Sequence, residues 1–121
     1  GYIVAPVGTA IGPCAFSSLA ATRDWLKTDM AKAFTRAYAK ARTWLISTDS
    51  EEVAHSLEGY FPDVHRSVLA STIAYYQKLG NWTPHIEITR PTYEVALDVF
   101  EHAGRITKRH AYEDVIAAPP I

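Results

Sequence analysis

Residues 12–26 read GPCAFSSLAATRDWL, and this stretch governs how the first part of the chain is expected to fold. A run of small and apolar residues from Cys14 to Ala21 lies between a Gly-Pro pair and the charged Arg23. Such a run, bounded by turn residues, is typical of a strand that is buried on both faces. Glycine and proline interrupt the chain before it. We therefore expect residues 1–22 to be non-helical, with Ile3–Val7 as a second short strand candidate.

From Thr28 onward, the apolar residues recur with the period of a helix of about five turns. Thr28 or Asp29 suits the N-cap position of this helix. A basic stripe of Lys32, Arg36 and Lys40 runs along another face, which we interpret as solvent-exposed. The spacing predicts that one apolar face is buried, and this face comprises Met30, Ala33, Phe34, Ala37, Ala41, Trp44 and Leu45.

Three more helices and a final helical turn are predicted after position 47. A capping box at Thr48–Glu51 starts a short helix that runs to about Glu58. Asp63 is the expected cap of a third helix, which Gly80 ends. A fourth helix lies between Pro91 and Gly104. The last turn lies at residues 112–116. The chain itself is thus expected to be mostly α-helical, with one or two strands near its amino terminus.

Composition restricts the classes of function. The chain has 121 residues, 12 basic and 13 acidic side chains and a formal net charge of -1, which is typical of one globular domain. This balance argues against non-specific nucleic-acid binding. Cys14 is the single cysteine, so an intrachain disulfide is excluded. We recognise neither a transmembrane segment nor a signal peptide in the residues given.

Residues that could carry out chemistry are scattered. Among the five histidines, we expect a usable ligand geometry for only two local pairings, His110 with Glu113 or Asp114 and His85 with Glu87, and two ligands do not make a zinc site. Cys14 follows Gly-Pro in an apolar run, which favours a buried structural thiol over a nucleophile. No glycine-rich phosphate loop or serine elbow occurs. We therefore expect no catalytic residue, no metal and no cofactor.

The order of these features resembles a known family. Gly12-Pro13-Cys14 leads into a small-residue strand ending Leu19-Ala20-Ala21-Thr22-Arg23-Asp24-Trp25-Leu26, as in the carboxyl-terminal part of periplasmic substrate-binding proteins of ABC transporters. The group is the nitrate, sulfonate, taurine and bicarbonate type, which includes the thiamine-pyrimidine synthases. The similarity continues through Ala33-Phe34-Thr35-Arg36-Ala37-Tyr38, Phe61-Pro62-Asp63, Tyr75-Tyr76-Gln77-Lys78-Leu79-Gly80-Asn81-Trp82, Gly104-Arg105-Ile106 and Tyr112-Glu113-Asp114.

The resemblance implies an α/β fold of the type II periplasmic-binding-protein kind, of which residues 1–121 form a single carboxyl-terminal fragment. Residues 1–22 would be a strand and hinge segment, and residues 23–121 the helical part that completes the first lobe. Cys14, Ala15, Phe16 and Ser17 would be the ligand neighbours at the cleft between the lobes.

The implied partners are a small-molecule solute and the membrane permease of the transporter, in the periplasm or another extracytoplasmic space. Two alternatives stay open: an enzyme fragment of the thiamine-pyrimidine synthase type, and a self-contained helical interaction domain. A lobe separated from its other strands would leave strand edges and apolar helix faces unpaired. For the isolated chain we therefore expect a homo-oligomer.

Overall fold

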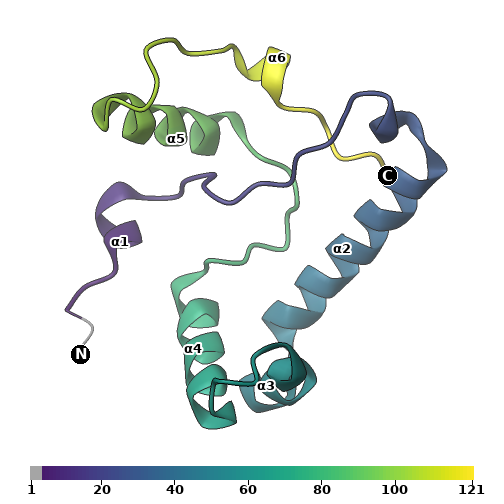
Figure 1. Ribbon diagram of the computed structural model, residues 1–121, viewed down its shortest axis with the longest axis vertical. Helices are drawn as coiled ribbons and strands as arrows, with labels where there is room; N and C mark the ends of the chain where they lie inside the picture. Colours follow the sequence, from purple (N-terminus) through teal and green to yellow (C-terminus); the bar gives the residue numbers. More distant parts are fainter. Residues whose placement is uncertain (1–3) are drawn as a thin grey trace. The chain divides into compact units, whose positions relative to one another are not determined.

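The computed structural model describes residues 4–121, which form helices joined by irregular segments (Figure 1). The chain divides into two compact units. The first contains the residues up to Lys27 together with Glu87–Pro119, and the second contains Thr28–Ile86 with Pro120–Ile121. The long helix α2, Asp29–Ser47, therefore belongs to the second unit, and helix α5, Arg90–His102, to the first.

The core of the second unit lies where two helices pack together. Helix α3, Ser50–Leu57, lies against helix α4, Arg66–Leu79, and the 3₁₀ turn η2, Glu58–Tyr60, follows α3 directly. Burial of the apolar side chains between α3 and α4 is the main source of stability here. The buried cluster consists of Val53, Ala54, Leu69, Ala70 and Ile73, against which Leu45, Leu57 and Trp82 pack.

Helix α2 begins where the sequence predicts, but it buries a different face. Thr28 is the N-cap, and its side-chain oxygen accepts a hydrogen bond of 3.2 Å from the Ala31 amide. The side chains of Ala31 and Thr35 are buried, whereas Phe34 is 46% exposed. The prediction that Phe34 lies in the core is therefore wrong. The buried face is rotated by about one residue, because helical periodicity marks an apolar face without showing that anything covers it.

The remaining helix ends follow the predicted order with small shifts. The cap of α3 is Asp49 rather than Thr48, since its carboxylate accepts from the Glu51 amide at 2.9 Å. Helix α4 is capped by His65 rather than Asp63, because the His65 Nδ1 accepts from the Ser67 amide at 3.3 Å. Gly80 ends α4 with a positive φ of 69°, as predicted.

The predicted strands are absent from residues 4–121. Residues 14–21 have no regular secondary structure, and Val7–Ile11 form the short helix α1 where a non-helical segment was predicted. Ile3 lies outside the described residues. The physical reason is that a strand needs a neighbour to satisfy its backbone groups, whereas the short helix does so locally, as in the 2.8 Å bond from the Gly12 amide to the Gly8 carbonyl. The α/β fold that the resemblance implies concerns a whole lobe, and it stays a prediction.

The first unit is built around α5. Pro91 lies in its first turn, as expected, and Tyr93 and Ala96 are its buried residues. The 3₁₀ turn η1, Trp25–Lys27, and helix α6, Tyr112–Val115, belong to the same unit. The helices of the described chain include none that is both long and apolar enough to span a bilayer.

The packing of α4 on α3 can be tested with two substitutions on the same helix. Ile73→Ala removes a side chain that is 4% exposed, and we expect a loss of about 3 kcal/mol in the free energy of unfolding. Val68→Ala removes one that is 54% exposed and should cost under about 0.5 kcal/mol. Urea denaturation followed by circular dichroism measures both values. Equal losses would show that this face of α4 is not the core.

Candidate functional site

The four residues expected to lie near a ligand are held beside the first turn of α5. The Ala15 amide donates a hydrogen bond of 3.0 Å to the Thr92 carbonyl. Cys14 and Ala15 are partly buried, whereas Phe16 and Ser17 are exposed. A single backbone bond thus fixes an otherwise irregular segment against a regular helix.

Phe16 also contacts α5 through its ring. The Phe16 and Phe100 rings are nearly parallel, with an interplanar angle of 14° and centroids 6.3 Å apart. Phe16 is nonetheless 73% exposed. Two stacked rings that leave this much surface in water form a platform on which a planar or apolar group can be placed.

A shallow hollow lies along α5. Its volume is about 450 Å³, and it opens widely to solvent. Its lining is mostly aliphatic, with one carboxylate and one imidazole one helical turn apart. It is lined by Ile11, Val95, Asp98, Val99, His102 and Ala103. Such a lining suits the apolar body of a solute and provides two groups that could orient it.

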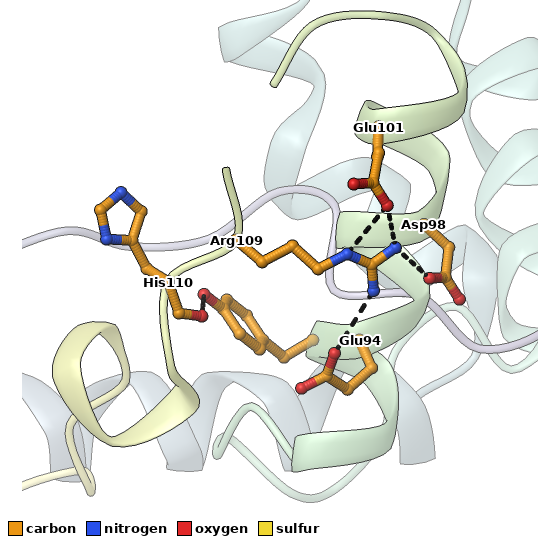
Figure 2. A network of polar contacts seen from close by, with 6 residues as sticks. Glu94, Asp98, Glu101, Arg109 and His110 are labelled. Carbon is orange, nitrogen blue, oxygen red and sulfur yellow. Dashed lines mark hydrogen bonds and ion pairs between the residues drawn. The ribbon is translucent and has the colours of Figure 1, made fainter. Parts of the chain in front are cut away.

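Arg109 is the centre of a network of charges on α5 (Figure 2). The Arg109 guanidinium lies 2.6 Å from Asp98 and 3.6 Å from Glu94, and its Nε donates to Glu101 at 3.0 Å. A second nitrogen of Arg109 also pairs with Glu101. The three carboxylates lie on one face of α5 because their spacings of four and three residues match the helical period. Asp98 belongs to both the network and the hollow.

These contacts affect the charge state of Arg109. Hydrogen bonds to Glu101 and then Asp98 raise the pKa of the Arg109 guanidinium above its ordinary value. Arg109 is therefore positively charged at neutral pH. It can position other groups but cannot transfer a proton.

The histidine pairings considered from the sequence do not form a site around His110. The His110 carbonyl accepts from the Tyr93 hydroxyl at 2.9 Å, whereas Glu113 pairs with Arg90. Residues 4–121 contain no group of three histidine, cysteine or acidic side chains that could hold a metal ion.

The sequence alone does not predict the Arg109 network. The spacing of Glu94, Asp98 and Glu101 on a predicted helix was a usable signal for an acidic face. Their partner was not predictable, because Arg109 lies in an irregular segment whose path no periodicity describes.

Comparison with known proteins gives one significant relative among curated proteins. The chain is 24% identical over 118 residues to a protein of Bacillus subtilis (strain 168) named "Putative binding protein YtlA". The aligned region is 96% of this chain and 35% of that protein, so the chain spans about a third of the length of the curated relative it matches. No family model matches the chain. No solved structure matches it. At the level that this relative supports, the chain is similar to a binding protein.

The attachment of the Cys14–Ser17 segment to α5 can be tested through the thiol. Phe100→Ala removes the ring on which Phe16 stacks, so we expect Cys14 to react several times faster with a thiol-specific reagent under native conditions. Val115→Ala, at a position that is also exposed, should leave the rate unchanged. The thiol-release absorbance gives the rate directly, since the chain has one cysteine. Equal rates in the wild type and the Phe100 variant would contradict this attachment.

Proposed function

We propose that this chain is part of the solute-binding component of an ABC importer, of the nitrate, sulfonate, taurine and bicarbonate type, without a catalytic step. Two findings support the proposal. The chain is similar over almost its whole length to a protein named as a binding protein. It also carries an exposed apolar surface of the kind that a larger protein would cover.

That surface is the observation that carries the proposal. On α2, Met30 is 68% exposed, Phe34 46% and Trp44 38%. Ala33, Ala37 and Ala41, which lie on the same face, are exposed as well, and no charged residue interrupts this face. We call this surface the α2 stripe, and it comprises Met30, Ala33, Phe34, Ala37, Ala41 and Trp44. Water rarely faces so continuous an apolar strip, so a partner surface is expected.

In the proposed protein, the α2 stripe packs against another part of the same polypeptide. That part corresponds to the portion of the relative that this chain does not cover. The segment Cys14–Ser17 then lies at one wall of the cleft between two lobes. Phe16 and the aliphatic lining of the hollow on α5 would contact the apolar part of a solute. The hollow has no arginine or lysine in its lining, so the opposite wall would supply the positive charge that holds an oxyanion.

The proposed role places the protein outside the cytoplasm, in the periplasm or an equivalent space, with a membrane permease as its partner. Closure of two lobes over the solute would bury most of its surface, and the closed form is what the permease would recognise. The residues of this chain would bind the solute and exclude water from it, and none of them would act on a covalent bond.

Calorimetry tests the proposed function with two forms of the protein. We expect the 121-residue chain to bind nitrate, taurine, an alkanesulfonate and a thiamine pyrimidine no more tightly than millimolar, because one wall of a cleft buries too little of a small ligand. The full-length protein encoded by its reading frame should bind one of them at micromolar concentration or better. Micromolar binding by the isolated chain, or no binding by the full-length protein, would contradict the proposal.

The α2 stripe also predicts self-association of the isolated chain. At tens of micromolar, light scattering coupled to gel filtration should give a mass above 13.4 kDa. Phe34→Lys places a charge in the stripe and should shift the mass toward the monomer. Thr43→Lys, an exposed position of the same helix outside the stripe, should not. A wild-type monomer with a cooperative melt would favour a self-contained helical domain instead.

A further inference from the structure

Residues 105–111, which we call the strap, connect the end of α5 to the start of α6. At one end, Gly104 adopts a positive φ of 65°, and the Arg105 amide donates to the Phe100 carbonyl at 2.8 Å. At the other end, the Tyr112 hydroxyl donates to the Ile88 carbonyl, and the Arg90 guanidinium lies 4.7 Å from the centre of the Tyr112 ring. One end of the strap is therefore held at the last turn of α5, and the other at the first residue of α5 and the segment just before it.

The middle of the strap is held by polar contacts from Arg109 and His110. Arg109 reaches Glu94, Asp98 and Glu101, which extend over two turns of α5 (Figure 2). The His110 carbonyl receives the Tyr93 hydroxyl. The strap backbone forms no regular structure with α5, and Arg109 provides the charged contacts between this part of the strap and the helix.

This attraction acts close to water. The side chains of Arg109, Glu94, Asp98 and Glu101 are all at least one-third exposed. Pairs at such positions are weak singly and are screened by salt, with a Debye length of about 10 Å at 0.1 M. The three carboxylates also repel one another along the helix once Arg109 is removed. A change that weakens the pairing of Arg109 with one carboxylate therefore also weakens its hold on the other two.

We propose that the strap is an electrostatic latch, closed at low ionic strength and released as salt screens Arg109 from Glu94, Asp98 and Glu101. Release separates the His110 carbonyl from the Tyr93 hydroxyl. It also leaves the Asp98 carboxylate unpaired at the rim of the hollow on α5. The latch thus changes the charge that the hollow presents to a ligand. This change in charge does not depend on the identity of a solute.

Limited proteolysis with a lysine-specific endoproteinase tests the latch on the full 121-residue chain. The enzyme cuts the bond after Lys108, within the strap, and the bond after Lys78, near the end of α4. Each rate is divided by the rate for the same bond in the urea-unfolded chain. We expect cleavage after Lys108, relative to that after Lys78, to rise at least threefold between 20 mM and 500 mM sodium chloride.

Variants separate the latch from general loosening. Arg109→Gln should show the high relative rate at both salt concentrations, whereas Arg105→Gln, in the same strap, should behave as the wild type. Glu101→Gln leaves the strap sequence intact and should raise the relative rate at low salt. A rate after Lys108 that does not respond to salt would overturn the proposal. So would an equal effect of the two arginine variants.

Discussion

The packing of α4 on α3 is the interaction on which the second unit depends. Val53 and Ala54 face Leu69, Ala70 and Ile73, and this cluster excludes water without help from a sheet. It also fixes the carboxyl-terminal end of α2, because the Gln77 side chain of α4 donates to the carbonyls of Leu45 at 2.8 Å and Thr48 at 3.0 Å. A side-chain amide thereby satisfies carbonyls at the end of α2 that have no partner within that helix.

The helices could be predicted from the sequence because their signals are local. Thr28 before an apolar periodic run, Gly80 after one, and Pro91 at the start of another each act through the backbone of their own turn. Errors of one or two residues at Asp49 and His65 arise because neighbouring polar side chains compete for the same amides. Periodicity also found the apolar face of α2. It could not show that Phe34 is exposed, since burial depends on a surface that the helix itself does not contain.

The candidate site was predictable only in part, for a related reason. Cys14 to Ser17 were selected by resemblance, and the structure holds them on α5 through the amide of Ala15 and the ring of Phe16. The carboxylates of α5 share a face because their spacing in the sequence matches the helical period, so this part could be predicted. Arg109 completes the network from a segment without periodicity, so its pairing with these carboxylates could not be predicted from the sequence. Residues 14–21 do not form the predicted strand. A strand needs a neighbouring strand to satisfy its backbone hydrogen bonds, and residues 4–121 contain no strand.

In the proposed protein, another part of a larger protein covers the α2 stripe. Met30 is the single methionine of the chain, lies within the stripe and is 68% exposed, so its oxidation reports on this surface alone. Dilute hydrogen peroxide should convert Met30 to the sulfoxide rapidly in the isolated chain at submicromolar concentration, as followed by mass spectrometry. In the full-length protein, the same residue should react at least ten times more slowly. Equal rates in the two proteins would show that the α2 stripe is not covered in the full-length protein.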